Sequence, residues 1–150
     1  MRISVQAEAF DPGAEVNAFT GTCAEAAAAN VGAIVTFSGL VRADGGMQAM
    51  EIEHYPGMTE RAITKIAETA QRRWSLGDVL VIHRHGRLTA GEVIMMVATA
   101  ARHRKDAFEA AEYLMDYLKS RAPFWKKELG PEGADWVAAK DADEDALKRW

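Results

Sequence analysis

The chain has 150 residues, of which 49% are hydrophobic and 27% charged, so it can bury a core and is not intrinsically disordered. A formal net charge of −4 argues against a nucleic-acid-binding protein, and no apolar run reaches the roughly 20 residues of a membrane-spanning helix. The single cysteine, Cys23, excludes an intramolecular disulfide, and the N-terminus carries no signal-peptide pattern. We therefore expect residues 1–150 to form one cytoplasmic domain.

The first half of the chain predicts strands and one helix. Residues 2–8 alternate loosely and predict a strand, and the alanine-rich segment 14–30 predicts a helix. Residues 32–39 are apolar on both faces, which predicts a central strand of a sheet. Residues 50–55 alternate and predict a strand with one solvent-exposed face. The glycine-rich loop 42–46 between these two strands predicts that they form a long hairpin.

The second half predicts two further helices and two buried strands. Thr59 is a suitable cap for a helix that extends to Trp74, and residues 79–82 and 93–100 read as buried strands. The strongest helix covers 106–121 and ends before Pro123, which cannot continue it. Its predicted apolar stripe consists of Phe108, Ala111, Leu114, Met115 and Leu118. The order of strands and helices predicts a mixed α+β fold.

A basic segment, Arg102-His103-Arg104-Lys105, lies between a predicted buried strand and a predicted helix. Cations are disfavoured at a helix N-terminus because the helix dipole is already positive there, whereas the exposed amides attract an anion. The segment therefore indicates a phosphate or carboxylate site. A solvated basic turn explains the same residue types equally well, and the residues alone leave both interpretations open.

A second group of cations surrounds the break at Pro123. Lys119 lies in the last turn of a predicted helix, where a cation is favourable for ordinary dipole reasons, and Lys126 follows the aromatic pair Phe124-Trp125. Two large aromatic side chains can wall a pocket and desolvate an amine, and the lowered pKa of such an amine suits acid, base or nucleophilic chemistry. Arg42 follows a predicted strand beside the glycine-rich loop. It contributes to a site only if it converges with the other two groups.

Four segments carry a resemblance to a known family. In order, they are Phe37–Arg42 (FSGLVR), Glu53–Met58 (EHYPGM), Val81–Arg84 (VIHR) and Met115–Glu128 (MDYLKSRAPFWKKE). Together they resemble the large subunit of molybdopterin synthase, and the resemblance runs from about Gly32 to the end of the chain. The second and fourth segments are far more specific than a short catalytic motif.

The resemblance implies an α/β hammerhead-type fold with an additional small antiparallel sheet. It implies a sulfurtransferase of molybdenum cofactor biosynthesis that forms a homodimer, with a small ubiquitin-like sulfur-carrier subunit docked at each end of a heterotetramer. That partner brings a C-terminal Gly-Gly thiocarboxylate to the substrate, cyclic pyranopterin monophosphate (precursor Z). Two sulfur atoms are added in turn to give molybdopterin. The transfer itself is expected to need no metal and no organic cofactor.

The same resemblance implies roles for individual residues. Lys119 and Lys126 match the two active-site lysines of the family. We expect Lys119 to activate the thiocarboxylate or shuttle protons and Lys126 to stabilise developing negative charge, although the resemblance leaves the division of roles open. Arg42, His103 and Arg104 match the groups that hold the phosphate of the substrate. That match agrees with the anion site indicated independently by the helix N-terminus.

Two positions depart from the family pattern. Lys140 lies where the family often has an arginine that reaches across the dimer, so a substrate-binding role there loses bidentate geometry. Leu40 replaces a frequent lysine beside Arg42. The main alternative to an enzyme is a non-catalytic pterin- or anion-binding paralogue of the same fold, which would need the anion site but not both Lys119 and Lys126. A pure interaction protein would leave the RAPFWK segment unexplained.

Overall fold

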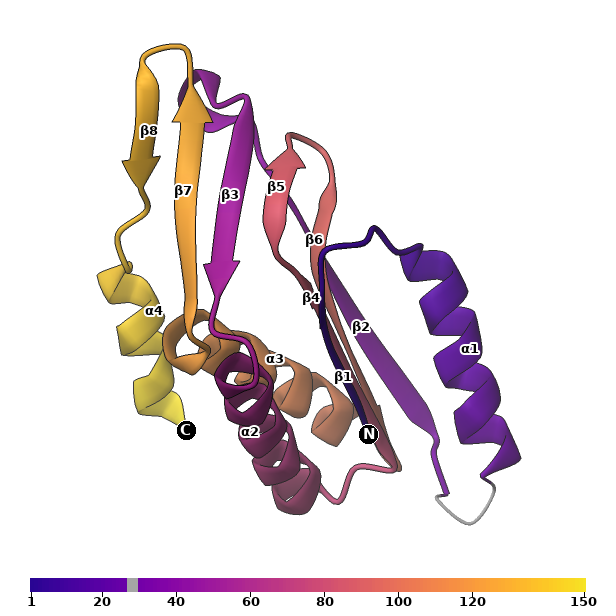
Figure 1. The fold of residues 1–150 in the computed structure, drawn as a ribbon. Coiled ribbons are helices and arrows are strands. Elements are labelled where there is room, and N and C mark those ends of the chain that lie inside the picture. The colour runs from indigo at the N-terminus through magenta and orange to yellow at the C-terminus, as the bar shows by residue number, and fades with distance from the viewer. Residues whose placement is uncertain (27–29) are drawn as a thin grey trace.

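The computed structural model describes residues 1–26 and 30–150, and Figure 1 shows their arrangement as an α+β fold, as the order of predicted elements indicated. In chain order the elements are β1 (Arg2–Gln6), α1 (Pro12–Glu25), β2 (Ala33–Leu40), η2 (Asp44–Gly46), β3 (Ala49–His54), α2 (Met58–Trp74), β4 (Asp78–Arg84), β5 (Gly86–Thr89), β6 (Val93–Ala101), α3 (Arg104–Arg121), β7 (Phe124–Gly130), β8 (Gly133–Trp136), α4 (Asp141–Ala146) and η3 (Leu147–Arg149). Among these helices, none has the length and apolar character that crossing a membrane requires.

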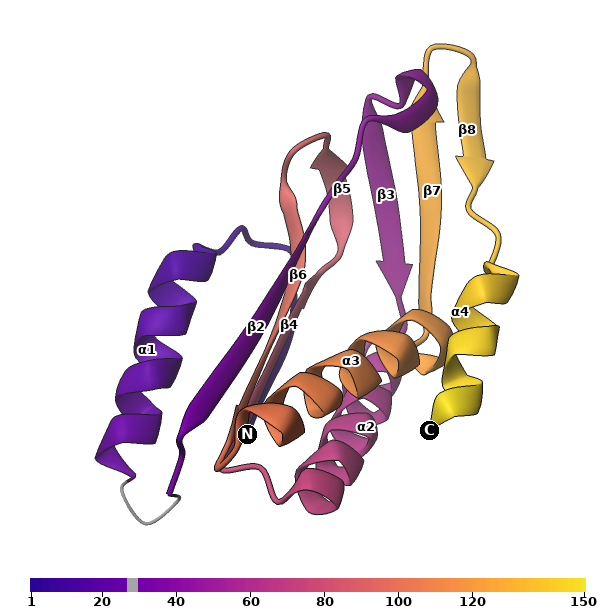
Figure 2. The same cartoon turned by 180° about the vertical axis from the view of Figure 1, so that it is seen from behind.

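The larger sheet has the strand order β1-β4-β6-β2, with β1 parallel to β4 and the other pairs antiparallel. Helix α1 lies on one face of this sheet, and α2 and α3 lie on the other (Figure 1, Figure 2). Strands β4 and β6 are therefore covered on both sides. Along β4, for example, Val81 packs with the core under α2 and α3, whereas Leu80 packs with the core under α1. This double coverage explains why both strands are apolar without alternation.

The smaller sheet is antiparallel and has the order β5-β3-β7-β8. Strand β4 leads into β5 across a single residue, His85, so one continuous segment joins the two sheets. In Figure 1 the smaller sheet stands above the ends of α2 and α3, and α4 lies beside α3 at the base of β7 and β8. This arrangement agrees with the additional small antiparallel sheet that the family resemblance implied.

Strand β2 differs from its prediction. Its two apolar faces predicted a central strand, yet within the described residues β2 pairs with β6 alone and forms an edge of the larger sheet. Phe37 and Leu40 on β2 are 43% and 55% exposed. The prediction failed because the apolar pattern reports what the faces of a strand can pack against, and not which strands lie beside it. The predicted hairpin is also wrong, since β3 belongs to the smaller sheet.

Helix α1 starts two residues earlier than predicted and ends at Glu25. Asp11 caps it, because its carboxylate accepts the backbone N–H groups of Gly13 and Ala14 at 2.8 and 3.3 Å, and Pro12 fits the first turn. Because α1 ends at Glu25, the helix predicted over residues 14–30 is too long at its C-terminal end. Residues 27–29 of that prediction lie outside the described residues.

Two details of the other helices were also predicted wrongly. Gly57, and not Thr59, occupies the cap position of α2. Thr59 is buried, and its hydroxyl accepts the backbone N–H of Tyr55 and donates to the carbonyl of Pro123, both at 3.0 Å. This contact ties the start of α2 to the break between α3 and β7. Phe108, predicted as part of the apolar stripe of α3, is 63% exposed. The buried face of the helix begins instead with the neighbouring Ala107.

Candidate active site

Lys119 and Lys126 lie near each other where α3 ends and β7 begins. Lys119 belongs to the last turn of α3, and Lys126 is the third residue of β7. Between them Ala122 adopts the extended conformation that its position before Pro123 favours, with φ −81° and ψ 128°. The turn brings the two amines close enough for the charge of Lys119 to act on Lys126.

Lys126 faces the interior of the structure. Half-buried and exposed residues alternate at the start of β7, so Phe124 and Lys126 share its inner face. Burial lowers the pKa of the Lys126 amine, and the positive charges of Lys119 and Lys140 lower it further, whereas Asp143 opposes the shift. A desolvated amine beside other cations has a larger uncharged fraction near neutral pH than a free lysine. Lys126 is therefore suited to accept a proton.

Helix α4 closes one side of the lysine group. The carboxylate of Asp143 lies 3.8 Å from the Nζ atom of Lys119, and the guanidinium of Arg121 binds Glu144 with contacts of 2.6 and 3.0 Å. These pairs hold α4 against the end of α3, with Lys140 at the start of α4. Asp143 was not among the site residues predicted from the sequence. The acidic segment after Lys140 complements the lysine-rich segment in charge, and that was the available signal.

His103 and Arg104 lie at the opposite end of α3. His103 occupies the cap position, Arg104 is the first helical residue, and both side chains are exposed. In the described structure the His103 side chain makes no capping hydrogen bond, so it is available to a ligand beside the helix N-terminus. The rise of an α-helix separates Arg104 from Lys119 by roughly 22 Å along the axis. Within one chain the predicted anion site and the lysine group are thus distinct.

Arg42 lies apart from both groups. It follows β2, its side chain is 74% exposed, and its Nε atom lies 3.3 Å from the Asp44 carboxylate. The other end of β2, at Ala33, pairs with Ala101 and so lies near the start of α3. Eight strand residues span roughly 26 Å. Within one chain the structure therefore does not bring Arg42 together with His103 and Arg104.

Three of the four histidines contact other rings. The rings of His54 and His85 lie with their centroids 4.1 Å apart, and the ring of His83 stacks on Phe124 at 3.8 Å. Among the residues that the structure describes, no group of three or more His, Cys, Asp or Glu side chains is placed to hold a metal ion.

The outer face of the smaller sheet carries exposed aromatic residues. Trp125 points outward and is 42% exposed, so of the aromatic pair expected to wall the lysine pocket only Phe124 faces inward. Trp125 stands edge-on to Tyr55 with centroids 5.0 Å apart. An open hollow of about 450 Å³ is lined by Glu53, His54, Tyr55, Trp125 and Trp136. Exposed aromatic residues of this kind are typical of protein-binding surfaces.

Comparisons with known proteins agree with the resemblance seen in the sequence. Residues 5–121 match the family described as "MoaE protein". A "Molybdopterin synthase catalytic subunit" from Cereibacter sphaeroides is 68% identical to this chain, and the match covers 100% of both proteins. Among solved structures, "Molybdopterin biosynthesis MoaE protein from Burkholderia ambifaria MC40-6" superposes with a TM-score of 0.82 at 50% identity, covering 99% of this chain and 96% of that chain. A chain of the "Protein-protein complex of subunit 1 and 2 of Molybdopterin-converting factor from Helicobacter pylori 26695" shares the fold, with a TM-score of 0.75, 24% identity and coverage of 93% and 90%.

Proposed function

The chain belongs to the MoaE family, whose curated members carry the name molybdopterin synthase catalytic subunit, and from this premise we propose the reaction that its residues carry out. The chain acts as a sulfurtransferase subunit. Sulfur passes from the C-terminal thiocarboxylate of a small ubiquitin-like subunit to cyclic pyranopterin monophosphate (precursor Z). Two such transfers yield molybdopterin.

The electrostatics of the two lysines support a division of roles. In each transfer the thiocarboxylate sulfur bonds to a side-chain carbon of the pterin and displaces the oxygen held by that carbon, which leaves on the opened phosphate ester or as water. The acyl–sulfur bond then breaks as a water molecule adds to the acyl carbon, leaving a carboxylate on the partner and the sulfur on the pterin. Lys126, as the desolvated amine, accepts the proton of that water. Lys119, the cation paired with Asp143, stabilises negative charge on the acyl oxygen. This assignment is the reverse of the one that the resemblance first suggested.

One observation carries the proposal of catalysis over that of simple binding. Lys119, Lys126 and Lys140 lie around the end of α3 with the carboxylate of Asp143, and Lys126 is drawn out of water. A site that only held a phosphate would gain from exposed, fully charged amines. It would lose affinity if one amine gave up its proton. The desolvation of Lys126 therefore favours a proton-transfer role over the non-catalytic paralogue.

The separated anion groups support a homodimer. Arg42 and the pair His103 and Arg104 lie at opposite ends of β2, and β2 is an exposed edge strand. If two copies pair through β2 around a two-fold axis, the strands run antiparallel and the C-terminal end of one lies beside the N-terminal end of the other. That arrangement places Arg42 of one copy near His103 and Arg104 of the second, and so forms a phosphate site from both.

The small partner is supported by a relative of the same fold. The Helicobacter pylori structure is titled as a complex of subunits 1 and 2 of a molybdopterin-converting factor. By analogy, each copy of this chain binds one small subunit, which makes the assembly a heterotetramer. The extended thiocarboxylate tail of that subunit reaches the lysine group at the end of α3.

Reconstitution tests the function directly. The chain is mixed with a thiocarboxylated small subunit and precursor Z, and molybdopterin is quantified. We expect product with the natural chain and with Lys65→Ala, a control that removes an exposed lysine of α2. Lys119→Ala and Lys126→Ala should each lower turnover by at least about 100-fold, as expected for loss of an acid–base or charge-stabilising group. Tight pterin binding without any product would instead support the binding paralogue.

A further inference from the structure

The ring of His83 lies under the residue that begins β7. His83 is in β4, is 5% exposed, and continues the row of Val79 and Val81 that faces α2 and α3. Its ring stacks on that of Phe124, with centroids 3.8 Å apart and an angle of 19° between the planes. Phe124 shares the inner face of β7 with Lys126. The stacked pair therefore lies on the same inner face of β7 as the amine of Lys126.

The protonation state of His83 follows from its contacts. Its Nδ1 atom lies 2.8 Å from the backbone carbonyl oxygen of Arg84. A carbonyl oxygen can only accept a hydrogen bond, so Nδ1 carries the hydrogen. Burial lowers the pKa of His83 to about 3, and the positive charge of Lys126 contributes to this shift. The ring is therefore a neutral and nearly flat surface at physiological pH.

We propose that the stack of His83 and Phe124 forms the dry wall of the Lys126 pocket, and that His83 is a positioning residue for this lysine. The proposal deepens the function proposed above and rests on it, because it assigns Lys126 the role of proton acceptor. His83 touches no reacting atom in this scheme. It acts by excluding water from one side of the amine.

Three charged side chains act on the amine, and the wall has a separate task. Lys119 on α3 and Lys140 before α4 oppose protonation of Lys126, whereas Asp143 on α4 favours it. Water entering from the His83 side would screen these charges and solvate the ammonium, which raises the pKa of Lys126 towards its ordinary value. Besides Lys126, the ionisable groups that act on His83 are His54 and His85.

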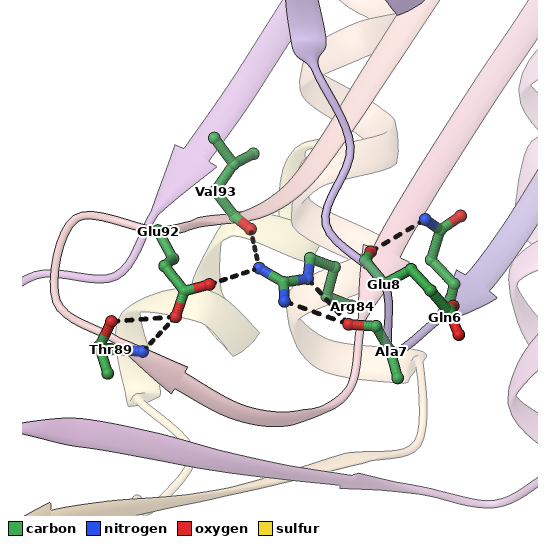
Figure 3. Close-up of polar contacts among 7 residues, drawn as sticks. All are labelled: Gln6, Ala7, Glu8, Arg84, Thr89, Glu92 and Val93. Atoms are coloured by element: carbon green, nitrogen blue, oxygen red, sulfur yellow. Dashed lines mark hydrogen bonds and ion pairs between the residues drawn. The ribbon is translucent and has the colours of Figure 1, made fainter.

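Two anchors hold the wall in place. The hydroxyl of Thr59 donates to the carbonyl of Pro123 and fixes the residue before Phe124. On the β4 side, the guanidinium of Arg84 binds the carbonyl of Ala7 and the carboxylate of Glu92, as Figure 3 shows. This network fixes the backbone of the residue whose carbonyl receives the His83 hydrogen bond. The stack is thus attached at both ends to buried structure.

The test measures the amine itself and does not depend on turnover. The purified full-length chain is acetylated with acetic anhydride at a series of pH values, and labelling of Lys126 is quantified by peptide mass spectrometry. Only uncharged amines react, so the pH profile reports the pKa of Lys126. Exposed Lys65 serves as an internal reference. The variants are His83→Ala and Phe124→Ala, which open the wall from either side, and His83→Phe, which keeps a neutral ring of similar size.

The expected result is a shift of the Lys126 labelling profile to higher pH in His83→Ala and Phe124→Ala, with no change at Lys65 and little change in His83→Phe. The reconstituted kcat of His83→Ala should follow, falling about tenfold for each pH unit of that shift, with KM preserved. An unshifted profile in a folded His83→Ala variant overturns the proposal. If that variant does not fold, an unshifted profile in Phe124→Ala overturns it. If His83→Phe shifts the Lys126 profile as much as His83→Ala does, a neutral ring at this position does not keep the pKa of Lys126 low, and the proposed wall is overturned as well. Absence of product with the natural chain would count against the proposed function and leave the labelling result standing.

Discussion

Replacement of Arg84 by methionine should weaken the junction between the two sheets. Arg84 is 7% exposed, and its guanidinium donates to the carbonyl of Ala7 at 3.2 and 3.1 Å, to the Glu92 carboxylate at 3.0 Å and to the Val93 carbonyl at 3.3 Å (Figure 3). One side chain thus connects the end of β1, the turn after β5 and the start of β6. Methionine keeps the apolar stem and removes every one of these donors.

The expected loss of stability follows from the acceptors that Arg84→Met leaves without their donor. Removing one partner of a buried ion pair costs about 3–5 kcal/mol, and a lost hydrogen bond to a carbonyl costs about 1 kcal/mol. Glu92 is 37% exposed and also accepts the N–H and hydroxyl of Thr89, so water and these donors recover part of the loss. We expect a net decrease of about 3 kcal/mol in the free energy of unfolding. For a chain of this length that corresponds to a decrease of roughly 6–12 °C in Tm.

Urea denaturation followed by circular dichroism measures this loss, at one fixed protein concentration because self-association would add to stability. Arg87→Met is the matched control, since Arg87 is an exposed residue of neighbouring β5 and its replacement should change the unfolding free energy by less than about 0.5 kcal/mol. If Arg84→Met is no less stable than Arg87→Met, the network is not what holds the junction, and the reasoning is wrong.

Three further predictions concern acid stability, substrate affinity and assembly. The folded pKa of His83 is about 3 and its unfolded value about 6.5, so the stability that neutral His83 contributes is present above pH 6.5 and declines as the pH falls towards 3. The free energy of unfolding should therefore fall by about 2 kcal/mol between pH 6.5 and 4.5 in the natural chain beyond any fall in His83→Phe, and an equal fall in that variant would refute the linkage. Arg104→Ala should weaken binding of precursor Z by about 10–100-fold in calorimetry, as expected for one charge-assisted contact, and unchanged affinity would exclude Arg104 from the phosphate site. Phe37→Lys places a charge on an exposed side chain of β2 and should shift the chain to monomers in light scattering, whereas Phe108→Lys, at an exposed position of α3, should not. If the Phe37→Lys variant remains a dimer, the dimer does not form through β2.

Local patterns predicted the elements that are long and buried. The strand predicted over residues 93–100 is β6, which extends one residue further, and the helix predicted over 106–121 is α3, which starts at Arg104 and ends at Arg121 as Pro123 required. Strand β8 was missed because all four of its residues are exposed, so it has no apolar alternation to detect. It exists because its backbone pairs with β7.

The sequence by itself determined the family, the candidate lysines and the break that separates them, because specific segments and a proline carry that information locally. Only the tertiary structure decided that β2 is an edge strand, that Arg42 lies far from His103, and that Asp143 and His83 belong beside the lysines. Strand neighbours and the solvation of an amine depend on contacts between residues that are distant in the chain. Those contacts exist only after α3, α4 and the two sheets have packed together.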